Sequence, residues 1–220
     1  MKKNTKQKII TAAIKLFNKQ GFAAVTLYEI AGSIKMTRGN LTYHFKTKDK
    51  LLKAIAEEMW DKMMVERNKS KQLPSFENLH NEIQLYYRFQ KQYAFIFLDR
   101  HVLKHPIIRT KFREMTEQTI KDNQSAIAFA LSTGNMKPEP FPGIYHNIAF
   151  NTWMLSFFWL AQQNIRGSKT KEDGERLVWS MLLPHFTEKG IKAFKAFFGE
   201  DYLAQLGQPF EVDIDKVISF

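Results

Sequence analysis

The chain has 220 residues, 44% of them hydrophobic, so it is long enough for a sizeable core and too apolar for a disordered protein. It contains no cysteine, which excludes disulfides, thiolate metal sites and a cysteine nucleophile. The charged start is unlike a signal peptide, and the longest apolar segment, residues 148–161, is interrupted by polar residues and too short to span a bilayer. We therefore expect a cytoplasmic protein with no membrane partner.

Positive charge is concentrated in the first quarter of the chain. Eleven of the 33 Lys and Arg residues, but only two of the 22 acidic residues, lie within residues 1–50, so this segment carries +9 of the net charge of +11. Such an asymmetry favours a polyanion-binding module joined to an electrically ordinary body. A solvated, lysine-rich surface is the alternative interpretation.

The first two helices have clear signals in the sequence. Apolar residues recur at helical spacing over residues 5–20 and predict the first helix. Gly21 follows it, at a position that favours a left-handed residue. Thr26 and Glu29 have the spacing of a capping box, which predicts a second helix that ends near residue 33.

Two further threonines mark the next helix starts. Thr37 is the expected N-cap of a short third helix, in which Leu41 and Phe45 are four residues apart and can anchor it to its neighbours. Thr47 is the expected N-cap of a longer fourth helix. The apolar side of that helix is predicted to contain Leu51, Leu52, Ile55, Met59 and Met63.

The rest of the chain is also predicted to be helical. Residues 134–143 contain three prolines and must form a loop. No segment shows convincing strand alternation, so the predicted fold class is all-α. The expected helices begin near residue 75 and cover residues 93–103, 106–133, 144–164 and 171–198, the last one kinked or split around Pro184 and Gly190.

Two short helices joined by a tight turn, within an excess of positive charge, are typical of a helix-turn-helix motif. In the third helix, Arg38 is suited to guanine and Asn40 to adenine, and Gly39 lets the backbone approach a duplex closely. The side chains expected to project outward from this helix are Thr37, Arg38, Asn40, Thr42 and Tyr43.

Residues 9–52 resemble the DNA-binding domain of the TetR (tetracycline-repressor-like) family of bacterial regulators. The strongest part is the run LTYHFKTKDKLL at residues 41–52. Two departures stand out: Ile34-Lys35 replaces the usual Ala-Gly of the turn, where a left-handed lysine is mildly strained, and Thr42 replaces a common aromatic residue. The matching residues before that run are Ile10, Ala13, Leu16, Phe17, Gly21, Phe22, Thr26, Ile30, Ala31 and Gly39.

The resemblance implies roles for individual residues. Thr37, Arg38, Asn40 and Thr42 would face base edges, and the phosphate contacts would come from Thr26, Tyr28, Tyr43, His44 and Lys48. Independently, a helix dipole disfavours a lysine in the first turn, so Lys48 makes better sense with a phosphate in front of it. For Tyr43 and His44, packing in the core is the alternative.

The resemblance also implies a helix-turn-helix domain over residues 1–47, joined through the fourth helix to a helical domain over residues 48–220 that binds an effector and dimerises. A small apolar effector is expected, although for any single aromatic residue a place in the core or an interface is the simpler explanation. The candidates for the pocket lining are Trp60, Met63, Met64, Phe95, Phe97, Trp153, Phe157 and Trp159.

A homodimer is expected because one short recognition helix contacts few base pairs, whereas two half-sites about 34–36 Å apart give usable specificity. The resemblance implies a four-helix interface from residues 143–164 and 171–198, with burial inside one subunit as the alternative. The apolar stripes that could form this interface contain Trp153, Phe157, Leu160, Trp179, Leu182, Leu183 and Phe186.

The sequence therefore predicts a DNA-binding transcriptional regulator, a ligand-released repressor of a palindromic double-stranded operator, and not an enzyme. No cofactor, metal site or catalytic residue is expected. The alternatives are a metal-dependent helical-bundle enzyme and an architectural DNA-binding protein without an effector. Glu77-x-x-His80 is half of a di-iron motif and His101 and His105 are four apart, but neither pair has the further ligands a metal site needs.

A role at a membrane surface predicts one long amphipathic helix rather than several short capped ones.

Overall fold

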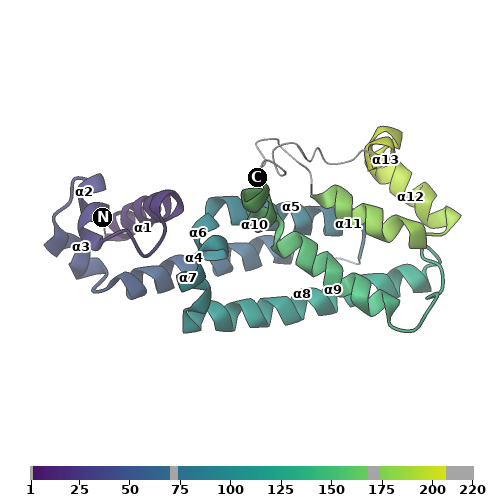
Figure 1. Ribbon diagram of the computed structural model, residues 1–220, viewed down its shortest axis with the longest axis horizontal. Coiled ribbons are helices and arrows are strands. Elements are labelled where there is room, and N and C mark those ends of the chain that lie inside the picture. Colours follow the sequence, from purple (N-terminus) through teal and green to yellow (C-terminus); the bar gives the residue numbers. More distant parts are fainter. Residues whose placement is uncertain (1, 70–73, 168–173, 207–220) are drawn as a thin grey trace, which may run out of the picture.

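The computed structural model describes residues 2–69, 74–167 and 174–206, with the side chains from Thr5 onward. Within these ranges every element is a helix, and one isolated antiparallel bridge joins Met136 and Phe186, so the all-α prediction is confirmed. Figure 1 shows a small helical lobe at one end and a larger helical body at the other, with α4 (Lys48–Lys69) running from the first into the second. None of the described helices is both long and apolar enough to cross a membrane.

The small lobe begins with α1 (Lys2–Gln20) and α2 (Leu27–Ser33). Gly21 has a φ of 83°, as the left-handed position after a helix requires, and the Phe22 ring packs on Phe17 with centroids 5.1 Å apart. The capping box is present: the Thr26 hydroxyl accepts from the Glu29 amide and the Glu29 carboxylate accepts from the Thr26 amide. Both helix boundaries therefore follow from local chemistry.

The turn to α3 (Arg38–His44) contains the strained residue that the sequence predicts. Lys35 has a φ of 55°, and no other residue except glycine has a positive φ in the described chain. The Thr37 hydroxyl accepts from the Asn40 amide at 3.3 Å and so caps α3. Leu41 is fully buried and Phe45 nearly so, and these two side chains anchor α3 to the lobe.

Helix α4 (Lys48–Lys69) joins the lobe to the body. The Thr47 hydroxyl accepts from the Lys50 amide at 3.1 Å, which confirms the expected cap. The predicted apolar side is buried throughout: it consists of Leu51, Leu52, Ile55, Met59 and Met63.

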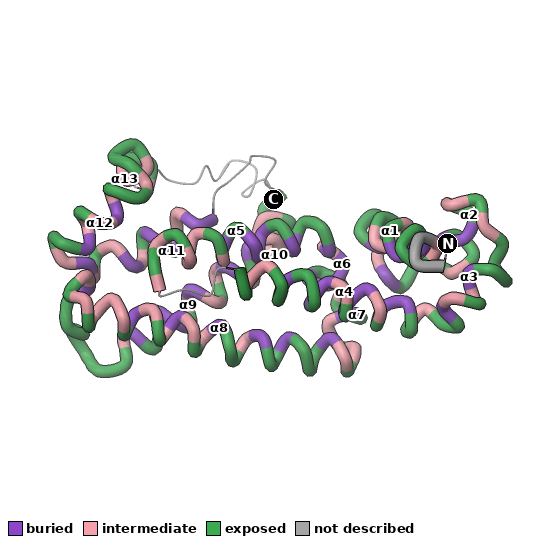
Figure 2. The backbone as a smooth tube through the Cα atoms, turned by 180° about the vertical axis from the view of Figure 1, so that it is seen from behind, coloured by how far each residue is buried: buried purple, intermediate pink, exposed green. Residues whose placement is uncertain are grey.

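The larger body is built from further helices. Figure 2 shows the buried residues of these helices alternating with exposed ones, as expected for a bundle around a shared core. The helices are α5 (Phe76–Gln92), α6 (Ala94–Leu98), α7 (Arg100–Lys104), α8 (Pro106–Ser132), α9 (Ile144–Phe157), α10 (Trp159–Arg166), α11 (Glu175–Leu182), the 3₁₀ turn η1 (Leu183–His185), α12 (Glu188–Phe198) and α13 (Glu200–Leu206).

One predicted helix, over residues 93–103, is two helices in the structure. Asp99 interrupts it with an extended backbone, and its carboxylate caps α7 by accepting from the amides of His101 and Val102. The same carboxylate accepts from the Phe22 amide at 2.9 Å, so the residue that interrupts the helix also contacts a distant part of the chain.

The predicted helix over residues 144–164 is also broken, at Phe158. The buried side chain of Gln90 bridges the break: its amide donates to the Ser156 carbonyl at 2.6 Å and its oxygen accepts from the Leu160 amide at 3.1 Å. These bonds satisfy backbone groups that an unbroken helix would pair internally.

The predicted helix over residues 171–198 is split, and its first three residues lie outside the described chain. Pro184 occupies η1, which confirms a break there. Gly190 is instead inside α12, where an added Cβ would lie 2.1 Å from the Asn135 carbonyl oxygen. Gly190 therefore permits close packing of α12 on the loop after α8.

Two clusters of buried residues form the core. The first runs without interruption from the small lobe through α4 into α5–α8. The second lies farther along the body, between α5, α9, α11 and α12. Because the first cluster crosses α4, the division of the chain at residue 47 stays a prediction.

Candidate functional site

The outer face of α3 presents polar side chains to solvent. Arg38, Gly39 and Asn40 are all exposed, and so is Thr37. A Cβ added at Gly39 would meet nothing within 4 Å, so no packing inside the chain requires a glycine at this place in the helix. Glycine costs helix stability, and the open space at this position leaves room for the backbone of α3 to approach a partner closely.

The hydroxyl groups of the predicted threonines are engaged within the chain. Thr26 and Thr37 cap their helices, and the Thr42 hydroxyl donates to the carbonyls of Arg38 and Gly39 at 3.0 Å. Thr42 is half-buried, which leaves its methyl group as the part suited to a base contact. The first role of these three threonine hydroxyl groups is therefore to fix the ends and path of α2 and α3.

Two tyrosines flank this face. Tyr28 at the start of α2 is 71% exposed and Tyr43 in α3 is 70% exposed, although tyrosine usually buries its ring. His44 is half-buried and packs edge-on against Tyr43, with ring centroids 5.3 Å apart. Core packing is thereby excluded for Tyr43, and both tyrosine side chains are exposed to solvent.

The structure gives Lys48 a role inside the small lobe that the sequence did not predict, and its expected phosphate contact stays a prediction. Its ammonium group donates to the carbonyl oxygens of Phe22 (2.8 Å), Ala23 (3.1 Å) and Val25 (2.9 Å), and it lies 4.6 Å from the centroid of the Phe22 ring. All three ammonium protons are used inside the lobe. Lys48 therefore ties the first turn of α4 to the loop after α1, and the three carbonyl oxygens compensate for its unfavourable place in the helix dipole.

Side chains also fix the small lobe to the body. The Asn18 amide donates to the Gln92 carbonyl at 2.9 Å, and its oxygen accepts from the Phe95 amide at 3.0 Å. Together with the Asp99 contact to the Phe22 amide, these bonds hold the end of α1 against α6 and α7. The lobe is therefore coupled to the body both through α4 and through this second contact.

The eight residues predicted to line a pocket are mostly core residues. Trp60, Phe97 and Phe157 each pack against the Phe112 ring, with centroids 5.1–5.6 Å apart, and Met64 is 44% exposed. For these three aromatic residues the ring contacts favour the simpler explanation, packing in the core. None of the eight predicted residues lines either of the two cavities described next. The eight residues are Trp60, Met63, Met64, Phe95, Phe97, Trp153, Phe157 and Trp159.

Two adjoining cavities lie between α5, α8 and their neighbours, beyond the end of α4. Their volumes are about 230 and 270 Å³, and they share Pro74, Ser75, Leu79, Asn123 and Ala126 as lining residues. The smaller one is polar on one side and the larger one is lined mainly by apolar and aromatic side chains. These cavities are the candidate effector site.

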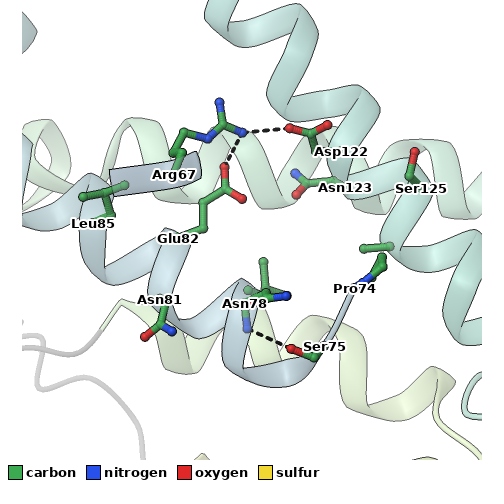
Figure 3. Close-up of a pocket in the computed structure, with 12 residues that line it drawn as sticks. Arg67, Pro74, Ser75, Asn78, Asn81, Glu82, Leu85, Asp122, Asn123 and Ser125 are labelled. Carbon is green, nitrogen blue, oxygen red and sulfur yellow. Dashed lines mark hydrogen bonds and ion pairs between the residues drawn. The ribbon is translucent and has the colours of Figure 1, made fainter. Parts of the chain in front are cut away.

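A group of charged side chains borders the smaller cavity (Figure 3). One guanidinium nitrogen of Arg67 in α4 lies 2.8 Å from Glu82 in α5 and 2.8 Å from Asp122 in α8. Burial raises the pKa of the Glu82 carboxyl above its ordinary value, Arg67 opposes this rise, and Asp122 adds to it. The sequence offered one signal: Arg67 follows Met59 and Met63 at four-residue steps, so a charge continues the apolar side of α4.

The residues of the predicted dimer stripes are buried or half-buried. Trp179, Leu182 and Phe186 are buried within this subunit, so for them the alternative explanation is correct. The half-buried ones are Trp153, Phe157, Leu160 and Leu183. Beside them, on α9 and at its break, three large apolar side chains that the predicted stripes do not include remain 40–48% exposed: Phe150, Met154 and Phe158.

The half-motif Glu77-x-x-His80 has a structural explanation. His80 contacts the buried Glu175 carboxylate at 2.8 Å, which also accepts from Gln84 and Trp179. This group fastens α5 to α11. Among the described residues, no group of three His, Asp or Glu side chains is placed to hold a metal ion.

Two family models match the chain. A model described as bacterial regulatory proteins, tetR family, matches residues 9–55. A model described as bacterial transcriptional repressor matches residues 56–194, which is more than half of the chain. The chain belongs to the tetR family of bacterial regulatory proteins. The resemblance inferred from residues 9–52 is thereby confirmed.

Individual relatives support the TetR-family assignment. Over 126 residues the chain is 33% identical to the transcriptional regulator QacR of Staphylococcus aureus, covering 53% of this chain and 65% of QacR. A TetR-family transcriptional regulator from Marinobacter aquaeolei has a similar structure, with a TM-score of 0.74 and 22% identity over 92% of this chain and 97% of that one. AibR in complex with isovaleryl coenzyme A and operator DNA has a TM-score of 0.59 and 18% identity over 82% and 97%. At these identities the two structures support the fold alone. The matches cover 30–65% of the first three curated relatives, so the chain spans less than two thirds of their length.

Proposed function

We propose that the chain is a transcriptional repressor that binds a palindromic operator as a homodimer and is released from it by a small effector. The observation that carries the proposal is the exposed face of α3, where Arg38 and Asn40 flank a glycine that no internal packing requires. Membership of the tetR family supports it. The AibR structure combines the same fold with operator DNA and a bound ligand.

In this proposal α3 lies in the major groove. Arg38 pairs with a guanine and Asn40 with an adenine, and the Thr42 methyl group meets a thymine. The exposed hydroxyl groups of Tyr28 and Tyr43 contact phosphates, and so do the free amides at the starts of α2 and α3. Lys48 acts as a positioning residue, because its bonds to three carbonyls hold the loop after α1 on α4.

The exposed apolar side chains of α9 are the proposed centre of the dimer interface. Phe150, Met154 and Phe158 lie on one side of that segment, and the half-buried Trp153 packs on two of these rings, with centroids 5.3 and 6.1 Å away. A second copy of the chain would bury this surface. The two α3 helices would then contact successive major grooves, about 34–36 Å apart.

A selection of binding sites from random DNA by the purified chain tests this function. We expect an enriched palindrome whose half-sites are about one helical turn apart. Phe150→Glu is expected to yield a monomer by light scattering that no longer enriches the palindrome. Retention of DNA without any enriched sequence would contradict the proposal and favour an architectural DNA-binding protein.

A further inference from the structure

The two adjoining cavities differ in chemistry although they share five lining residues. The larger one is an apolar chamber: Phe76 lies between Trp179 and Phe186 there, with ring centroids 5.7 and 5.6 Å away. The smaller one is bordered by the charged side chains Arg67, Glu82 and Asp122. A molecule that fills both must be apolar at one end and polar at the other.

The charge at the polar end is negative. One cation, Arg67, faces two carboxylates, Glu82 and Asp122, so the group carries a net charge of −1 when all three are ionised. The two carboxylates are not equally satisfied. Asp122 accepts from Arg67 with one oxygen and from Gln118 with the other, both at 2.8 Å.

Glu82 has a single partner in the described chain. Its Oε1 is buried and lies 2.8 Å from Arg67 as an ion pair without a well-aligned hydrogen bond, and its Oε2 has no interaction with any described residue. The side chain is three-quarters buried, 25% exposed, and lines the smaller cavity. A partly buried carboxylate whose second oxygen has no protein partner is stabilised by a further positive charge or hydrogen-bond donor.

We propose that the effector is an amphipathic cation, with an apolar or aromatic body in the chamber around Phe76 and a positively charged nitrogen beside the Glu82 carboxylate. The two cavities together have the volume typical of a site for a drug-sized molecule. This inference rests on the proposed function and names the chemical class of its effector.

The same group of residues connects the effector to DNA. Arg67 is in the last turn of α4 and holds it to α5 and α8, while Lys48 in the first turn holds α4 to the small lobe. A cation beside Glu82 competes with Arg67 for that carboxylate and weakens the hold on α4. A different tilt of α4 then moves the small lobe and changes the spacing of the two α3 helices.

Three probes with one shared body test the proposal. They are a naphthylhexyl-trimethylammonium salt, its neutral isostere with a tert-butyl group in place of the ammonium, and the corresponding naphthylhexyl sulfonate. Calorimetric titration of the full chain is expected to show the cation bound about tenfold more tightly than the neutral isostere, because one partly buried charge pair accounts for about that factor. The sulfonate is expected to bind weakest. Equal binding of the cation and the isostere, or tightest binding of the sulfonate through Arg67, would overturn the assignment.

Variants locate the site. Glu82→Gln is expected to reduce the affinity for the cation about tenfold. Its affinity for the neutral isostere is expected to stay within about a factor of two of that of the unchanged chain, which would show that the cavity is intact. Ala126→Phe fills the junction of the two cavities and is expected to abolish binding of both probes. The matched control Glu114→Gln, on the exposed side of α8, is expected to change neither. An unchanged affinity for the cation in Glu82→Gln would remove Glu82 from the site.

Operator binding is measured on the same samples without a probe. A chain that binds its operator but does not distinguish the three probes refutes the cationic effector and leaves the proposed function standing. A chain that distinguishes the probes but enriches no operator refutes the proposed function instead.

Discussion

Gly39→Ala separates the stability of the small lobe from its contact with DNA. In the free chain the added methyl group meets nothing within 4 Å, so the substitution causes no clash. Alanine is the better helix former, and the free energy of unfolding is expected to rise by up to about 0.5–1 kcal/mol. Any loss of DNA binding in this variant is therefore not a loss of folding.

The loss on DNA follows from the place of Gly39 between Arg38 and Asn40 in α3. If the backbone of α3 comes close to the base edges, the methyl group pushes the helix outward and lengthens both flanking contacts. Loss of one bidentate base contact costs about 1–3 kcal/mol, which corresponds to an affinity about 5–150-fold lower per half-site.

Fluorescence anisotropy with the selected operator measures this loss, and urea unfolding at a fixed protein concentration measures stability. Gly32→Ala is the matched control: Gly32 lies in the neighbouring helix α2, is exposed, and would also place its methyl group in open space. We expect the control to gain stability and keep its affinity. A Gly39→Ala variant with the affinity of the control would falsify a close approach of α3 to the duplex.

Four further substitutions test the account. Arg38→Ala is expected to cost about 1–3 kcal/mol of operator binding and to relax the preference at one base pair per half-site, and a repeated selection that returns the same consensus would remove Arg38 from the base contacts. Lys48→Met is expected to lower the free energy of unfolding by about 1–3 kcal/mol and to change the slope of log affinity for DNA against log salt concentration by less than one unit. The exposed control is Lys46→Met, and a slope that Lys48→Met reduces by a full unit more than this control would show that Lys48 contacts a phosphate. Lys35→Gly is expected to raise the free energy of unfolding by about 1 kcal/mol, because the left-handed backbone at this position strains any residue with a Cβ, and no gain in urea unfolding would contradict that strain. Asp99→Ala is expected to lower stability by about 1–2 kcal/mol through the lost cap of α7 and to weaken the effect of a bound cation on operator affinity; unchanged coupling would show that α4 alone connects the two parts.

The small lobe could be predicted from the sequence because its signals are local. Thr26, Thr37 and Thr47 each cap the helix that follows them, and Gly21 and Lys35 have the expected positive φ. Each of these features depends on residues at most three or four positions apart. The exposed face of α3 follows directly, because Leu41 and Phe45 fix which side of that short helix is buried.

The larger body could be predicted less well because its details depend on distant contacts. Asp99 breaks a helix while it binds Phe22, and Gln90 bridges a break beside Ser156, pairings that span more than sixty residues. The bonds of Lys48 inside the small lobe could not be predicted for the same reason, since its three acceptors precede it by more than twenty residues. Aromatic composition alone could not distinguish a pocket lining from the core, because such side chains fill space as readily as they line it.

Protection of guanine N7 from methylation by dimethyl sulfate tests most directly whether α3 lies in the major groove, where N7 is exposed. On the selected operator we expect protected guanines in two half-sites about one helical turn apart, and loss of protection at one guanine per half-site in Arg38→Ala. Full methylation of every guanine in the bound operator would contradict the account.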